Sequence, residues 1–315
     1  MIKQEINELK RLYTPSNCSI TRICGCYVDG EKNKKTEFKE AFLSLPEEEI
    51  FKYFELLRKT LSGSLGKNLL NLDFPLASEQ EGGTQAALLA LRDSKLKDDA
   101  LIEEFYDRVI NTYEYVGNYL ILLIHDAYDV PGKTTDGLTM DDASDTVFEY
   151  IMCCICPVNL SKPGLSYDNI NNEFHNRIRD WVVEMPETGF LFPSFNDRAT
   201  DIHSTLFYSK NPEEAHSEFV ENILGCTMPL SAGTQKEAFQ ALIEETLGDE
   251  VEYEVVKNIH ENLTEMIEEH KEIPEPLTLD KHQVKSLFEK SGVKEEKLTD
   301  FDKLYDAAAG EDTSL

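Results

Sequence analysis

Two unusually apolar stretches near the middle of the chain set the strongest limit on its fold. Residues 119–124 and 150–158 are almost entirely apolar, which is typical of strands in a sheet that is covered on both faces. Both are far shorter than the roughly 18 residues that a membrane helix needs. We therefore predict two central strands, joined as a long-looped hairpin, and no segment that spans a membrane.

Weaker patterns predict further strands and helices around this pair. Residues 20–28 and 36–42 flank turn-forming residues and predict a hairpin, while apolar segments between residues 177 and 208 predict an antiparallel meander. Apolar side chains at helical spacing predict helices before and after these strands. We expect an α+β fold, in which an antiparallel sheet is flanked by helices. Its strands are expected near these residues: Ile23, Leu122, Ile151, Val182, Leu191 and Leu206.

The charge of the chain is large, negative and uneven. Of 315 residues, 31 are Lys or Arg and 60 are Asp or Glu, a net charge of 31 − 60 = −29. Residues 244–315 contain 21 acidic and 8 basic residues, or 21 − 8 = −13. We therefore divide the chain into a core domain, residues 1–243, and an acidic helical region, residues 244–315. Within that region Pro274-Glu275-Pro276 predicts a linker, and the two short helices expected beyond it should pack on the main body or on a partner.

This charge excludes some partners and suggests others. Binding along a phosphate backbone draws its free energy from cationic side chains, so we expect no nucleic acid partner. The acidic C-terminal helices are either a solvated surface that keeps the protein in solution, a docking surface for a basic protein, or an imitation of the charge of DNA.

The cysteines indicate a reducing compartment. Seven cysteines, an odd number, are typical of free thiols rather than of a disulfide framework. The first residues lack the basic start and apolar stretch of a secretory signal, so we expect a cytoplasmic protein. Cys24 and Cys26 lie on one predicted strand and Cys154 and Cys156 on another. If those strands were neighbours, four thiolates could converge on a zinc ion; otherwise these are reduced core cysteines.

A second set of candidate residues combines histidine and aspartate. His125 and Asp126 end an apolar strand, while Asp197, Asp201 and His203 crowd a predicted turn. Together they suggest a metal-dependent hydrolase, although their spacing matches no established metal-binding motif. The simpler interpretation gives His125 a capping role and Asp197 a role in turn hydrogen bonds.

A glycine-containing segment and a pair of arginines are two further candidates for ligand binding. Gly63-Ser64-Leu65-Gly66-Lys67 is too short for a phosphate-binding loop and follows a helix, so no cofactor is predicted. Arg177 and Arg179, close to Trp181, form either an anion site or pairs with neighbouring acidic side chains.

Several long strings resemble an uncharacterised bacterial family, catalogued as a domain of unknown function and frequent in anaerobic gut bacteria. The strings are residues 19–28, 119–132, 156–165 and 196–198. The resemblance spans essentially the whole chain, implies no activity, cofactor or site residue, and implies that family members continue past residue 315.

Three functions follow from these observations. The first is a non-catalytic interaction or regulatory protein that binds a partner through its acidic helices. The second is the metal-dependent hydrolase that uses His125, Asp126, Asp197, Asp201 and His203. The third is a metal or redox site built from cysteines.

Overall fold

The computed structural model describes residues 1–133, 139–140, 146–212, 216–229, 232–248, 253–270 and 277–310. Internal contacts divide the chain into two compact units. The first unit consists mainly of Lys3–Ser64 and Asn68–Met228, and from here on it is the one we call the core domain; the C-terminal unit is mainly Pro229–Leu315. The position between residues 243 and 244, where the acidic charge begins, lies inside a helix of the second unit. The linker expected at Pro274-Glu275-Pro276 lies outside the described residues.

The core domain contains one large antiparallel sheet, as the sequence predicted. Its strands follow the order β2-β1-β4-β7-β11-β14-β3, and β10 also pairs with β7. The bounds are β1 Ile20–Val28, β2 Lys34–Ala41, β3 Leu69–Asp73, β4 Asn118–Asp129, β7 Val147–Leu160, β10 Trp181–Val183, β11 Thr188–Phe192 and β14 Ser204–Ser209. The two apolar stretches form the central pair β4 and β7, which confirms the predicted hairpin.

Three two-stranded ribbons lie outside this sheet. They are β5 Gly132–Lys133 with β6 Thr139–Met140, β8 Leu165–Asp168 with β9 Glu173–Asn176, and β12 Ser194–Asn196 with β13 Ala199–Asp201. The sequence did not predict β3 or the β8–β9 hairpin.

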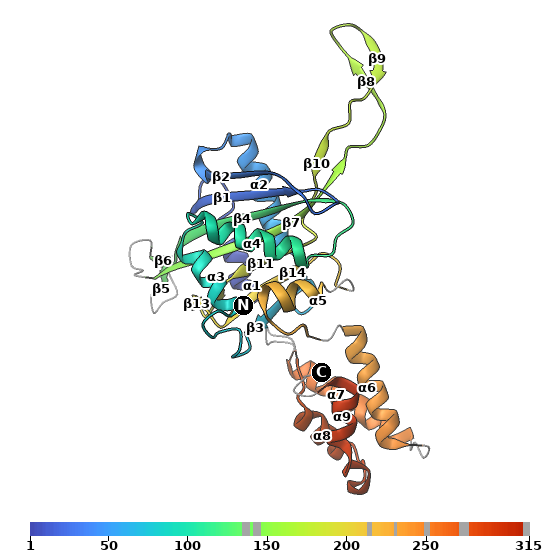
Figure 1. Cartoon of the computed structure of the whole chain (residues 1–315). Helices are drawn as coiled ribbons and strands as arrows, with labels where there is room; N and C mark the ends of the chain where they lie inside the picture. The colour runs from blue at the N-terminus through green and yellow to red at the C-terminus, as the bar shows by residue number, and fades with distance from the viewer. Residues whose placement is uncertain are drawn as a thin grey trace. The chain divides into compact units, whose positions relative to one another are not determined.

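Helices cover both faces of the sheet (Figure 1). On one face, α2 contacts β7 and β11, and the tyrosine that follows α1 reaches the side chain of Tyr150. On the other face, α3, α4 and η2 bury their apolar side chains against β4, β7 and β11. The bounds are α1 Lys3–Lys10, η1 Phe42–Ser44, α2 Glu47–Thr60, α3 Thr84–Asp93, α4 Asp99–Thr112, α5 Ser217–Phe219 and η2 Val220–Leu224. These layers explain why β4 and β7 carry apolar side chains in both directions.

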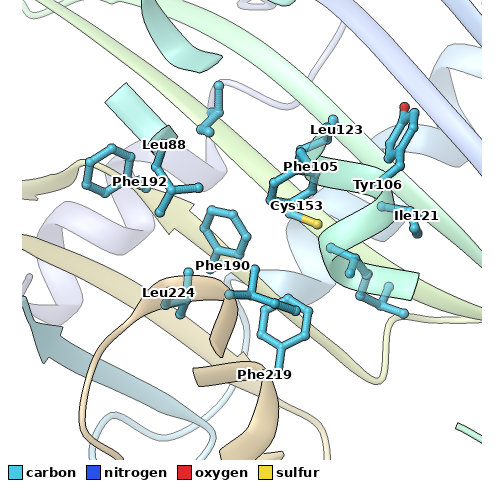
Figure 2. Packing of buried hydrophobic residues seen from close by; sticks show 14 of the residues in the cluster. Leu88, Phe105, Tyr106, Ile121, Leu123, Cys153, Phe190, Phe192, Phe219 and Leu224 are labelled. Carbon is cyan, nitrogen blue, oxygen red and sulfur yellow. The ribbon is translucent and has the colours of Figure 1, made fainter. Parts of the chain in front are cut away.

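The core beneath α3 and α4 is aromatic and closely packed. Phe190 of β11 lies 6.2 Å from the ring of Phe105 in α4 and 6.2 Å from that of Phe219 in α5, measured between ring centroids. Figure 2 shows these rings around Cys153. On the opposite face, Gly189 allows close approach, because a Cβ there would lie 2.3 Å from the carbonyl oxygen of Cys153. The sheet therefore has little spare volume on either side.

The C-terminal unit has a core of its own. Its helices are α6 Ala232–Leu247, α7 Tyr253–His270, α8 Lys281–Lys290, η3 Glu295–Leu298 and α9 Phe301–Ala309. α9 packs on α6 and α8 packs on α7, around a cluster that includes Leu242, Ile259, Phe288 and Phe301. The last two helices therefore share a core with α6 and α7, which precede them. Asp280 begins α8 with a capping box.

Candidate functional site

The sheet separates the four cysteines that were candidate zinc ligands. β4 lies between β1 and β7, so the two cysteine-bearing strands are not neighbours. Leu123 of β4 is aligned with Cys24 on one side and with Cys153 on the other, which places these side chains on one face. Cys154 comes next along β7 and therefore points to the opposite face. The expected convergence of four thiolates is wrong, because it assumed adjacent strands.

All seven cysteines are free thiols, and six of them are buried. Burial raises the pKa of Cys26 and of Cys154 to about 12 in each case. The sulfur of Cys154 lies 3.1 Å from the hydroxyl of Thr60 in α2. Because a thiol must lose its proton to bind a metal or to act as a nucleophile, these cysteines are suited to packing.

His125 lies at the α3–α4 face of the sheet and is fully buried. Its Nδ1 shares a hydrogen bond of 2.7 Å with the hydroxyl of Thr21, and its Nε2 has no partner. Burial lowers the pKa of His125 to about 4. The side chain is therefore a neutral imidazole that links the neighbouring strands β1 and β4.

Asp126 points to the opposite face, where it joins two buried tyrosines. Tyr150 donates a hydrogen bond of 2.6 Å to Oδ2 of Asp126, and the hydroxyls of Tyr13 and Tyr150 lie 3.0 Å apart. Burial raises the pKa of Asp126, although the bond from Tyr150 opposes this. This network ties the segment after α1 to the middle of the sheet.

The three remaining candidates lie around the β12–β13 hairpin. Asp197 is exposed in its turn, with a φ of 50°. Asp201 accepts hydrogen bonds from Asn196 (2.6 Å) and Ser204 (2.7 Å). Burial raises the pKa of Asp201, but these bonds outweigh burial and lower it overall. The network holds the hairpin together through Asn196, Asp201 and Ser204.

His203 belongs to a separate contact on the surface. Its Nδ1 lies 2.6 Å from Oε1 of Glu79, and this hydrogen bond raises the pKa of His203. The five candidates thus lie in separate environments. His125 and Asp126 are buried on opposite faces of the sheet, Asp197 and Asp201 belong to the β12–β13 hairpin, and His203 is paired with Glu79 on the surface. Across the described ranges, no three His, Cys, Asp or Glu side chains are grouped so as to hold a metal ion. The hydrolase centre expected from the sequence is therefore not assembled by these residues.

A groove of about 530 Å³ lies along α8 in the C-terminal unit. It is lined by polar side chains that include Lys285 and Asp302, whose charged atoms lie 3.5 Å apart. Lys281 at the same groove is paired with Asp306. Because these cations are already paired, the groove offers no evident anion site.

A different feature stands out as the candidate functional site. After β7, residues 161–183 form what we call the arm, which includes β10 at its base and whose hairpin β8–β9 extends beyond the end of the sheet (Figure 1). The register aligns Tyr167 with Phe174 and Leu165 with Asn176, so Leu165, Tyr167 and Phe174 share one face. The alternate residues Ser166, Asp168, Glu173 and His175 share the other. The hairpin is amphipathic, although no layer of the core domain covers it.

The exposure of the arm is large for apolar side chains. Leu165 is 74% exposed, Phe174 is 71% exposed and Ile170 at the tip is 85% exposed. The rings of Tyr167 and Phe174 contact each other, with centroids 5.2 Å apart. Contiguous exposed apolar surface of this kind marks interaction sites in folded proteins.

Hydrogen bonds define the shape of the arm from its base to its tip. Asp168 accepts a bond of 2.8 Å from the backbone N–H of Ile170 and closes the tip. At the base, Leu160 is aligned with Trp181, and Arg179 donates to the carbonyl of Ser161 at 2.6 Å. The expectation that Arg177 and Arg179 pair with acidic side chains is wrong within the described residues, where neither makes an ion pair.

These observations define an α+β protein whose candidate contact surface is an exposed amphipathic hairpin. None of the helices in the described ranges is long and apolar enough to cross a membrane. The chain belongs to the family described as "Domain of unknown function (DUF4317)", whose model matches residues 1–315. No curated protein matches the sequence.

Proposed function

We propose that this protein is a non-catalytic, cytoplasmic protein-binding protein, in which the core domain is a scaffold and the arm is the contact surface. The observation that carries this proposal is the uncovered apolar face of the arm. An isolated two-stranded hairpin is at best marginally stable in water, and its apolar face gains free energy when it is covered. The seven free thiols support the cytoplasmic assignment.

Photo-crosslinking tests the proposal directly. A photoreactive phenylalanine analogue placed at Phe174 should crosslink to a discrete protein in cells. The same analogue placed at Leu76 is the matched control, because Leu76 is 75% exposed on the core domain and should give no such product. Equal crosslinking from both positions, or none from position 174, would contradict the proposal.

The arm can also be removed with little expected damage to the sheet. Ser161 donates its backbone N–H to the carbonyl of Asp180 at 2.8 Å, so the two residues already flank a hairpin. Replacing residues 162–179 with Asn-Gly would close it with a two-residue turn. This arm-less variant should keep its circular dichroism spectrum but no longer co-purify with the protein that is crosslinked from position 174 of the wild type. Retained co-purification would contradict the proposal.

We also propose that the acidic C-terminal helices help to attract a basic protein partner. α7 carries five exposed glutamates and one lysine. Deleting residues 277–315 is a poor test, because Phe288 and Phe301 belong to the core of that unit. Changing Glu261 and Glu265 to Lys is a better test: it should weaken binding of a basic protein at low salt, independently of the contact made by the arm. Unchanged binding would remove the helices from the interaction.

A further inference from the structure

We infer that the apolar face of the arm binds the same face of the arm of a second copy of this chain, with the two arms antiparallel. This inference rests on the proposed function, because it names the partner of the surface assigned there. Three observations support it: the size of the exposed surface, the charge along the arm and the charge of the rest of the chain.

The exposed apolar surface matches what one partner of a stable interface contributes. Tyr167, Phe174 and Trp181 are each more than half exposed, and aromatic side chains of about 150–250 Å² then offer roughly 350 Å² together. Leu165, Ile170 and Ile178 are each about three-quarters exposed or more and add a comparable area. Only Leu165, Tyr167 and Phe174 are placed on one face by the strand register, and the total over all six side chains approaches the roughly 800 Å² per partner of a standard interface.

The shape of the arm suits a copy of itself. Two flat apolar faces can stack about 10 Å apart, as the sheets of a sandwich do. A two-fold axis then gives each arm the same contacts, which is the commonest symmetry of protein dimers. The apolar face defined by Leu165, Tyr167 and Phe174 lies in the β8–β9 hairpin, and exposed apolar side chains also occur at the base (Trp181) and at the tip (Ile170), so antiparallel arms would bring apolar side chains together at both ends of the contact.

The charges of the arm favour this antiparallel arrangement. The tip carries Asp168 and Glu173 and no basic residue. The base carries one acidic and three basic residues: Asp180, Lys162, Arg177 and Arg179. Antiparallel arms place each acidic tip beside the basic base of the other copy, whereas parallel arms place like charges together. Charge complementarity of this kind fixes orientation more than affinity.

The charge of the whole protein points the same way. The arm has three acidic and three basic residues, so the net charge of −29 resides outside it. Each leg of about ten residues spans roughly 30 Å when extended, several times the Debye length of about 8–10 Å in physiological salt. Antiparallel arms hold the two acidic scaffolds at opposite ends of the contact, where their repulsion is screened.

A lipid surface is the competing partner for such an arm. The acidic tip opposes it, because Asp168 and Glu173 flank the residues that would enter the bilayer first. The burial of the tip between two proteins requires no such insertion. The structure therefore favours a second copy, and lipid binding becomes one outcome of the test.

Sedimentation equilibrium of the full chain tests self-association through the arm. The wild-type protein should be a dimer at micromolar concentrations. Leu165→Ser and Phe174→Ser should each raise the dissociation constant roughly 10- to 100-fold, and the arm-less variant should be a monomer. Leu76→Ser is the matched control for Leu165→Ser and should leave the dimer unchanged. A monomeric wild type, or a dimer whose dissociation constant is unchanged in the arm variants, would overturn the inference.

Charge variants test the antiparallel arrangement. One variant, Asp168→Asn with Glu173→Lys, makes the tip basic; another, Lys162→Glu with Arg177→Glu, makes the base acidic. Each alone sets like charges together and should weaken self-association several-fold. An equimolar mixture should recover the wild-type dissociation constant, because each tip then meets an opposite base. A mixture no tighter than its components would show that the arms are not antiparallel.

Two further measurements separate this inference from the proposed function. Crosslinking from position 174 should yield a product of twice the mass of the chain. A crosslink to a different protein, with a monomeric wild type, would overturn the inference and leave the proposed function standing. Flotation of the monomeric wild type with anionic phospholipid vesicles, abolished by Phe174→Ser, would overturn both in favour of a lipid surface.

Discussion

The strands β11 and β9 each carry a phenylalanine, Phe190 and Phe174, in opposite environments. β11 is apolar and is paired on both sides, by β7 and β14, whereas β9 is mostly polar and pairs only with β8. Phe190 is fully buried beneath α4 and α5, whereas Phe174 is 71% exposed. A phenylalanine in a strand is therefore not buried by the strand alone. Burial follows from the helices that cover a strand, and no such layer reaches the arm.

The largest predicted effect compares these two phenylalanines. Phe190→Ala should lower the free energy of unfolding by about 3–5 kcal/mol, because it leaves a cavity in a closely packed aromatic core. Phe174→Ala should change it by less than about 0.5 kcal/mol at low protein concentration. Urea unfolding followed by circular dichroism measures both. Equal losses would mean that the arm packs on the core domain in solution.

A smaller effect concerns the face of the sheet that buries His125. Its pKa is lowered to about 4 by burial, against about 6.5 in an unfolded chain. The unfolded state therefore binds a proton first, so stability is present above about pH 6.5 and is lost as the pH falls toward 4, by about 2–3 kcal/mol. His125→Asn should flatten this part of the pH dependence of urea unfolding.

His203 provides the control for that measurement. It is exposed and its pKa is raised by Glu79, so His203→Gln should leave the loss of stability below pH 6.5 in place. A wild-type slope that survives in the His125 variant would show that the imidazole is solvated.

Asp126 predicts a change of opposite sign on the other face of the sheet. Burial raises its pKa, so the ionised carboxylate costs stability at neutral pH, and the cost disappears as the pH falls toward about 4. Asp126→Asn keeps an acceptor for Tyr150 and should stabilise the protein at neutral pH, with the gain shrinking in acid. Tyr150→Phe, which removes the donor, should be destabilising. A loss of stability in Asp126→Asn at neutral pH would contradict this account.

The smallest predicted effect concerns thiol accessibility, which reports whether both faces of the sheet are covered. Cys18 is half-buried and the other six cysteines are buried. A thiol reagent should therefore label Cys18 first in the native protein and all seven after denaturation. Mass spectrometry of the labelled peptides identifies the site. Rapid labelling of Cys154 would mean that the layer formed by α1 and α2 opens readily.

The sequence could predict the elements that depend on local pattern. The uninterrupted apolar stretches predicted β4 and β7, and turn-forming residues predicted the β1–β2 hairpin. β3 was missed because Leu69–Asp73 is short and alternates only once. The β8–β9 hairpin has a readable signal, since apolar residues alternate with polar ones around Asn171 and Asn172.

The candidate site depended on information that one sequence does not contain. Whether Cys24 and Cys154 could meet depended on strand order. Because β4 lies between β1 and β7, the two cysteines are not on neighbouring strands. His125 and Asp126 are neighbours in sequence but point to opposite faces, because successive side chains of a strand alternate. The importance of the arm lies in an absence of covering helices, which only the arrangement of the whole core domain reveals.

The outermost strand of the sheet has a consequence for how the protein behaves at high concentration. β2 pairs with β1 on one side only, and it carries Lys34, Lys35 and Lys39. An unpaired edge strand can pair with a strand of another chain and so start aggregation. Adding a strand here would crowd these ammonium groups, two of which bind acidic residues of α4. Lysines thus act as gatekeepers at this border and should keep the protein from polymerising there.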